Sequence, residues 1–224
     1  RFWFCIISIF FNLLLLSSCR MDYSHNPLRK ELNVDTIPQY KGNWCWAACS
    51  QMVMNFLDPS PDTSLYSQCK QAWKSLSPEQ AALCIQNTCC LGSGGTYDHV
   101  SDSICNHTNW PIFEQFGFRC MDTYTNWNYL SWEDMVHQID NSKPLCLTYN
   151  WTGGGAHMIV MDGYKIDSNN QLFVHLIDPY AHYVGNDTSR YCYTTIRYTT
   201  QEENRRSPNH VLGRCYYNIE KIAN

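Results

Sequence analysis

The sequence is poor in charged residues, which make up 16% of its 224 positions and leave a formal net charge of −4. Its basic residues form only short pairs such as Arg205–Arg206, so no positive stripe is available to bind phosphate groups, and we expect no nucleic-acid partner. Internal repeats and low-complexity linkers are also missing. Hydrophobic residues make up 44% of the chain, which is enough for a buried core and argues against disorder.

The strongly apolar segment from Phe2 to Leu16 is shorter than a membrane-spanning helix, which needs about 20 apolar residues. Its length suits the core of an export signal. It ends at Leu16-Ser17-Ser18-Cys19, which resembles the lipobox of bacterial lipoproteins, where the cysteine is lipidated and becomes the mature N-terminus. We therefore expect a signal peptide at 1–18 and a lipid on Cys19 that attaches the protein to a membrane. Export with an unmodified Cys19 remains an alternative.

Export implies a secreted or envelope-anchored protein, in the periplasm or on the outer surface of a bacterium, where cysteines oxidise. The chain has thirteen cysteines; Cys5 and Cys19 belong to the export segment, which leaves eleven. An odd number predicts one free thiol and five disulfides, whose connectivity the sequence does not define. We predict that Cys45 is the free thiol and that Cys49, four residues later, is paired in a disulfide.

Helical patterns precede strand patterns along the chain. Residues 45–57 are predicted to form a buried helix that Asp58-Pro59 stops, residues 63–75 and 78–87 shorter helices, and Ser131 the N-cap of another. The predicted strands are Pro144–Tyr149, His157–Ile166, Leu172–Ile177, Tyr191–Tyr198 and Arg214–Ile219. This order predicts an α+β fold with an antiparallel sheet, spanning 38–224, after a polar tether or short pro-segment at 19–37.

Cys45 stands where a helix N-terminus would lower the pKa of its thiol, because free N–H groups and the helix dipole favour negative charge. Gln39, six residues earlier, is close enough to reach around the intervening turn. A base is offered by His157, which follows three glycines at the start of a predicted strand. Asp178 ends the next strand, so antiparallel pairing would bring it beside His157. Asp162, on the histidine's own strand, is a competing carboxylate.

Gln39 and the run Cys45-Trp46-Ala47-Ala48 resemble the active-site segment of papain-like cysteine peptidases. The histidine region, Gly153 to Val160 followed by Gly163-Tyr164, and the later Ile177-Asp178-Pro179 resemble a bacterial C39-like branch that includes secreted effectors. The resemblance implies a helical lobe carrying the nucleophile, packed on an antiparallel sheet lobe carrying His and Asp. It also implies that Cys45 attacks a polypeptide, His157 acts as base, Asp178 orients it and Gln39 stabilises the oxyanion.

Two other hypotheses remain open: an acyltransferase of the same fold, and a non-catalytic, disulfide-rich surface lipoprotein. Trp44, Trp46, Gly154 and Gly155 flank the proposed site and are predicted to contact substrate. The remaining histidines show no zinc-ligand spacing with the cysteines, so we expect neither metal nor cofactor. A monomer is expected.

Overall fold

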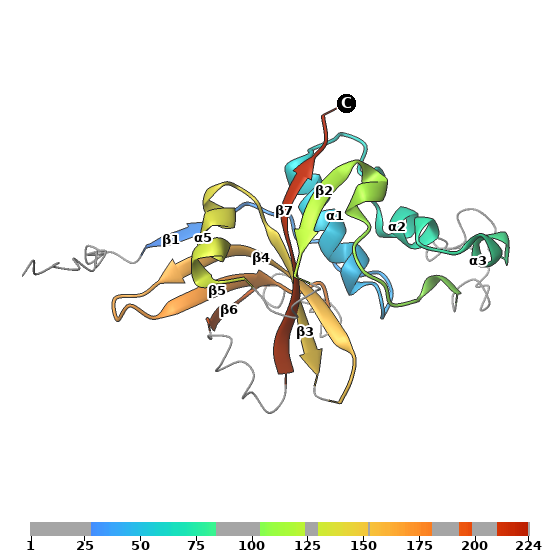
Figure 1. Ribbon diagram of the computed structural model, residues 1–224. Coiled ribbons are helices and arrows are strands. Elements are labelled where there is room, and N and C mark those ends of the chain that lie inside the picture. Colours follow the sequence, from blue (N-terminus) through green and yellow to red (C-terminus); the bar gives the residue numbers. More distant parts are fainter. Residues whose placement is uncertain are drawn as a thin grey trace, which may run out of the picture.

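The computed structural model describes residues 28–83, 104–123, 130–151, 153–180, 193–198 and 210–223. The fold is α+β, as predicted, with most helices before most strands (Figure 1). The strands are β1 (Arg29–Glu31), β2 (Phe118–Asp122), β3 (Leu145–Trp151), β4 (Ala156–Ile166), β5 (Leu172–Ile177), β6 (Tyr193–Arg197) and β7 (His210–Lys221). The helices are α1 (Cys45–Leu57), α2 (Gln68–Lys74), α3 (Pro78–Leu83) and α5 (Trp132–Asp140), with a 3₁₀ turn, η2 (Phe113–Phe116).

The strands of the described residues form one sheet in the order β2, β7, β3, β4, β5, β6, and each neighbouring pair is antiparallel. The short strand β1 pairs with β4 beyond the end of β3, where Arg29 lies opposite Lys165. Gly163 makes this docking possible, because a Cβ atom there would lie 2.7 Å from the carbonyl oxygen of Lys30. β7 is the last of these strands in the sequence, yet it lies between β2 and β3 in the interior of the sheet.

Helix α1 is the central helix of the fold. All of its residues from Trp46 to Met54 are buried, as expected for a helix whose apolar and small side chains extend around every face. It packs against β3 and β4 on one side and against α2 on another, so the sheet determines how its first residue is presented (Figure 1). It ends at Leu57, and Asp58-Pro59 follow.

Several predicted elements occur at the expected places. Helix α1 and strand β5 have the predicted bounds, and the hydroxyl of Ser131 accepts a 3.1 Å hydrogen bond from the backbone N–H of Asp134 at the start of α5. Sequence analysis missed two strands. β1 lies inside the segment expected to be a tether, and β2 follows a region without a clear pattern.

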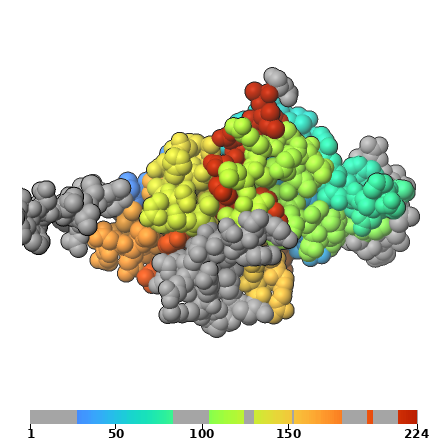
Figure 2. Space-filling view, in the orientation of Figure 1, coloured from blue at the N-terminus to red at the C-terminus, as the bar shows by residue number. Residues whose placement is uncertain are grey.

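The molecule is elongated, with α2 and α3 at one end and the hairpin of β4 and β5 toward the other (Figure 2). Among the described residues, no helix has the length and apolar character needed to cross a membrane. The expected signal peptide and Cys19 lie outside the described residues.

Candidate active site

Cys45 is the first residue of α1, so its half-buried thiol lies at the helix N-terminus. The free backbone N–H groups of the first helical turn and the positive end of the helix dipole lie at this end of α1. Trp44 occupies the N-cap position without a side-chain hydrogen bond to the helix. Its fully buried indole instead donates a 2.7 Å hydrogen bond to the carbonyl oxygen of Cys105, which anchors the turn before Cys45.

His157 and Asp178 come from neighbouring strands. Because β4 and β5 pair antiparallel, with Val160 opposite Ile177, the start of β4 lies beside the residues that follow β5. The Nε2 atom of His157 lies 2.7 Å from the Oδ1 atom of Asp178. The same oxygen accepts a 2.8 Å hydrogen bond from the backbone N–H of Tyr180, which holds the carboxylate toward the imidazole.

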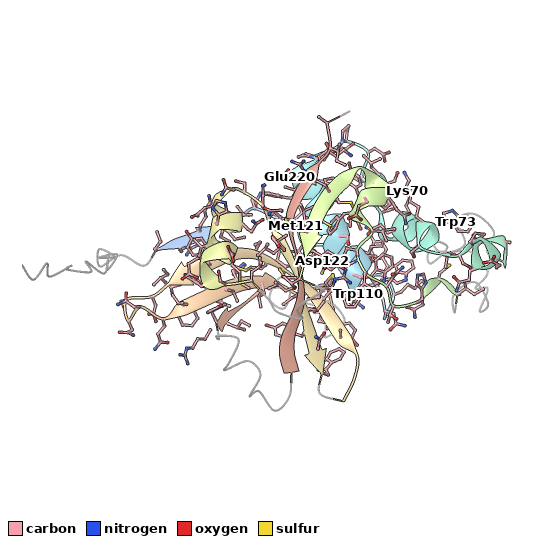
Figure 3. All side chains as sticks on the ribbon, in the orientation of Figure 1. Lys70, Trp73, Trp110, Met121, Asp122 and Glu220 are labelled. Atoms are coloured by element: carbon pink, nitrogen blue, oxygen red, sulfur yellow. The ribbon has the colours of Figure 1, made fainter. Side chains whose placement is uncertain are left out.

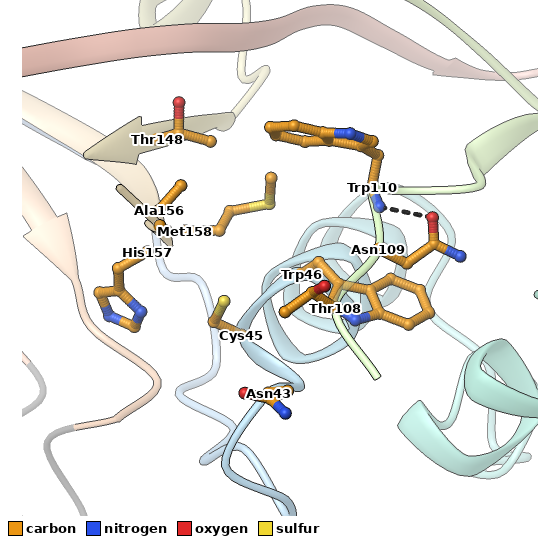
Figure 4. A pocket seen from close by; sticks show the side chains of 11 residues that line it. Asn43, Cys45, Trp46, Thr108, Asn109, Trp110, Thr148, Ala156, His157 and Met158 are labelled. Atoms are coloured by element: carbon orange, nitrogen blue, oxygen red, sulfur yellow. Dashed lines mark hydrogen bonds between the residues drawn. The ribbon is translucent and has the colours of Figure 1, made fainter. Parts of the chain in front are cut away.

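His157 is hydrogen-bonded to Asp178, and together with Cys45 it lines one cavity. Because Asp178 occupies Nε2, the thiol faces the other side of the ring (Figure 4). Burial lowers the pKa of His157, but the hydrogen bond to Asp178 and the nearby Cys45 sulfur outweigh it and raise that pKa to about 9. Burial would raise the pKa of Asp178, whereas its bond to His157 lowers the pKa overall. At neutral pH, a protonated imidazole therefore stands between a carboxylate and the sulfur.

Two aromatic rings flank His157. The Trp151 ring stacks on the imidazole at a centroid distance of 6.4 Å and an interplanar angle of 11°. The Tyr180 ring meets it edge-on at 6.2 Å. Both side chains are about half-exposed, so they limit the access of water to the imidazole while keeping an outer surface that a bound chain could contact.

The predicted substrate-binding glycines form the tight connection between β3 and β4. Gly154 and Gly155 have φ values of +93° and +92°, a region that favours glycine. The backbone N–H of Trp151 donates to the carbonyl oxygen of Gly155 at 3.1 Å, which closes the turn. These glycines thus hold Trp151 above His157.

Gln39 connects the two halves of the site. Its side chain is almost fully buried, and its Nε2 atom donates to the carbonyl oxygens of Lys41 at 2.9 Å and Gly42 at 2.8 Å. Its backbone N–H donates to the carbonyl oxygen of Pro179 at 3.0 Å. The turn before Cys45 is therefore tied to the segment that carries Asp178.

The competing carboxylate, Asp162, lies elsewhere. It is 1% exposed, and its Oδ1 atom lies 2.6 Å from Nδ1 of His175 on β5. The geometry thus gives Asp162 a histidine of its own and leaves Asp178 as the carboxylate beside His157. Within the described residues, no group of three or more His, Cys, Asp and Glu side chains could hold a metal ion.

The sequence model of the Peptidase_C39 like family matches residues 31–203, a range that includes Cys45, His157 and Asp178. The chain belongs to this family. A search of curated proteins finds no match. Membership of the Peptidase_C39 like family indicates a cysteine peptidase, whose substrates are polypeptides, and agrees with the thiol, imidazole and carboxylate that the fold brings together.

A cavity of about 440 Å³ opens beside Cys45 and His157 of this Peptidase_C39 like protein (Figure 4). Trp46 and Gly155, two of the predicted substrate contacts, line it, whereas Trp44 is buried in the core. Among the lining residues that were not predicted from the sequence are Thr148, Trp110 and Met158. Met158 follows His157 directly on β4, where side chains alternate between the two faces, so the strand pattern did not predict it. Trp110 lies within residues 97–117, where the sequence shows no clear pattern.

The prediction that Cys45 is the only free thiol is wrong. Cys49, expected in a disulfide, is a free and fully buried thiol, and further free thiols occur at Cys120, Cys146 and Cys215. Burial is the main reason that the pKa of Cys49 is raised, so its thiol stays neutral and packs as a small apolar group. The odd number of cysteines did not predict which of them are free, because some cysteines are packed in the core as thiols rather than paired in disulfides.

Proposed function

We propose that this protein hydrolyses peptide bonds through a thioester acyl-enzyme on Cys45. The observation that carries the proposal is that Cys45, at a helix N-terminus, and His157 line one cavity, and that His157 is hydrogen-bonded to Asp178. A nucleophile, a base and a group that orients the base are the parts that covalent acyl transfer requires.

In acylation, His157 holds the proton of the Cys45 thiol, and the thiolate attacks the carbonyl carbon of the scissile bond. The C–N bond then breaks, and His157 delivers the proton to the leaving amine, which departs. In deacylation, His157 removes a proton from water, whose oxygen attacks the thioester carbon. The C–S bond breaks, the carboxylic acid product leaves, and the sulfur and imidazole regain their starting state.

The oxyanion formed at each attack needs donors. The backbone N–H of Cys45 lies at the open N-terminus of α1, and Gln39 is the proposed second donor. The Nε2 atom of Gln39 already donates to Lys41 and Gly42. It would therefore exchange one of these bonds for the oxyanion, in line with catalytic hydrogen bonds that tighten only when substrate is bound.

The arrangement of elements supports a papain-like division into a helical lobe around α1 and a sheet lobe around β4 and β5. Export, a mature N-terminus at lipidated Cys19 and a place on the cell envelope complete the proposal. They rest on the apolar run and the Leu16–Cys19 motif.

The decisive experiment uses an epoxide inhibitor of thiol proteases, with the labelled cysteine located by mass spectrometry. We expect one label, on Cys45, that blocks the cleavage of a mixed peptide library. Cys49→Ala is the matched control, because Cys49 is one turn further along the same helix and fully buried. It should still be labelled, whereas Cys45→Ala should not.

Two outcomes would redirect the proposal. Labelling of Cys45 with transfer of the acyl group to added amines, and no hydrolysis, would identify an acyltransferase. An unlabelled wild-type protein that cleaves nothing would indicate a non-catalytic surface protein.

A further inference from the structure

The cavity beside Cys45 is lined by side chains without formal charge, apart from His157 at its edge. Two indole rings, Trp46 and Trp110, and the thioether of Met158 make up its larger walls (Figure 4). Met158 is 2% exposed and Trp46 is 1% exposed, so these walls are parts of the packed core rather than mobile surface groups. A cavity of this kind favours an apolar occupant.

Several polar atoms around the cavity already have partners. The Thr148 hydroxyl donates to the carbonyl oxygen of Arg214 at 3.1 Å, and Figure 4 shows it turned away from Met158. The Asn109 side-chain oxygen accepts a 2.8 Å hydrogen bond from the backbone N–H of Trp110. The Trp46 indole N–H donates to the carbonyl oxygen of His107. The cavity therefore offers mainly carbon surface to what enters it.

Trp110 is held in place from behind. The guanidinium carbon of Arg214, on β7, lies 4.8 Å from the centre of the Trp110 ring and 4.6 Å from that of Tyr216. Arg214 is itself fixed by Asp122, on β2, through a 2.7 Å hydrogen bond, and its side chain is only 14% exposed. Asp122 and Trp110 lie near one another in Figure 3, as their shared contact with Arg214 requires.

We infer that this cavity binds one large apolar side chain of the polypeptide substrate, and that Arg214 sets the preference by holding Trp110 as the far wall. The inference rests on the proposed peptidase function, whose site it deepens. Trp110 and Met158 contact the substrate side chain, whereas Arg214 is a positioning residue that acts through Trp110.

The test begins with a library of unstructured synthetic peptides in which all pairs of neighbouring residues occur. Cleavage sites are mapped by mass spectrometry, and one cleaved peptide is resynthesised with Phe, Leu, Ala, Lys or Glu at the most selective position. We expect kcat/KM to be at least about tenfold higher for Phe or Leu than for Ala, and lowest for Lys and Glu.

Variants of Trp110 and Arg214 then test whether the cavity wall determines the side-chain preference. Trp110→Ala should reduce the ratio of kcat/KM for Phe over Ala by about tenfold, and Trp110→Phe should retain most of it. Arg214→Gln should lower the same ratio although Arg214 does not line the cavity. The matched control is Arg119→Gln, an arginine on β2 that pairs with Glu220 instead, and its ratio should equal that of the wild type. Each kcat/KM is normalised to the fraction of Cys45 titrated by the epoxide inhibitor, so partly unfolded variants are still comparable.

The outcomes distinguish a failure of the proposed side-chain preference from a failure of the proposed peptidase function. A wild-type enzyme that cleaves peptides without apolar preference, or whose preference survives Trp110→Ala, overturns this inference and leaves the peptidase function standing. An unchanged ratio in Arg214→Gln overturns the positioning role. Failure of the wild type to cleave any peptide overturns the proposed function, and this inference with it.

Discussion

Nε2 of His157 and Oδ1 of Asp178 lie 2.7 Å apart, although nearly all of β4, the turn after it and the whole of β5 separate the two residues in the sequence. Replacing Asp178 with Asn would keep the size of the group but allow the wrong imidazole tautomer. We expect Asp178→Asn to reduce kcat by about 10⁴-fold, less than the loss of the nucleophile. Steady-state kinetics would measure this, with Asp162→Asn as the comparison. A greater loss in Asp162→Asn would mean that the wrong carboxylate has been assigned.

Cys45 and His157 should behave as one catalytic unit. We expect Cys45→Ala and His157→Ala each to reduce kcat by roughly 10⁶-fold, and the double variant to be no slower than either one. Circular dichroism would verify that all three variants are folded. Losses that multiply in the double variant would show that His157 does not act on the Cys45 thiol.

The raised pKa of His157 predicts the pH above which the activity of the enzyme falls. We expect kcat/KM to fall as pH rises through about 9, where the imidazolium loses its proton. His157 should also contribute to the free energy of unfolding. Its contribution is fully present below the pKa of an unfolded histidine, about 6.5, and is lost as pH rises through the raised pKa of the folded state. In Asp178→Asn, the alkaline limit should move to lower pH. A limit that stays in place would assign it to another group.

The turn between β3 and β4 should tolerate an added methyl group at Gly153 but not at Gly155. Gly155→Ala adds a Cβ atom 3.1 Å from the Trp151 ring at a φ of +92°. We expect a loss of roughly 1–3 kcal/mol in unfolding free energy, and lower kcat because the Trp151 ring shifts against His157. Gly153→Ala is the control, since no atom lies within 4 Å of its added Cβ. Equal effects in both variants would contradict this account of the turn.

The second histidine–carboxylate pair should affect stability rather than catalysis. The hydrogen bond to Asp162 raises the pKa of His175 in spite of burial, which lowers it. His175→Asn should therefore destabilise the protein most below about pH 6.5, and the difference should shrink as pH rises through the raised pKa. Urea unfolding at several pH values would test this, with the exposed His137 as control in His137→Asn. A difference that grows with pH would reverse the assigned protonation state.

The parts of the fold that the sequence predicts are those with local patterns. Helix α1 is marked by apolar residues at helical spacing and by the Asp58-Pro59 stop after it, and β5 by dense apolar and β-branched residues between turns. The approach of His157 to Asp178 was also predictable, because antiparallel neighbours place the start of one strand beside the end of the other.

Features that depend on distant partners were missed. A three-residue strand such as β1 has no period to detect, and it forms because Gly163 leaves space on β4. Trp110, which lines the cavity, packs against Arg214, about a hundred positions later in the chain. Cys49 is a free thiol buried in the core around α1, and an odd or even number of cysteines carries no information about burial.

The interior place of β7 determines when the sheet can be completed. A ribosome makes Cys45, His157 and Asp178 before it makes β7, yet β2 and β3 have no common neighbour until β7 inserts between them. The same strand brings Arg214 to Trp110. Contacts that close such long loops form late in folding. We therefore expect proteolytic competence to arise only after β7 has been synthesised and has inserted between β2 and β3.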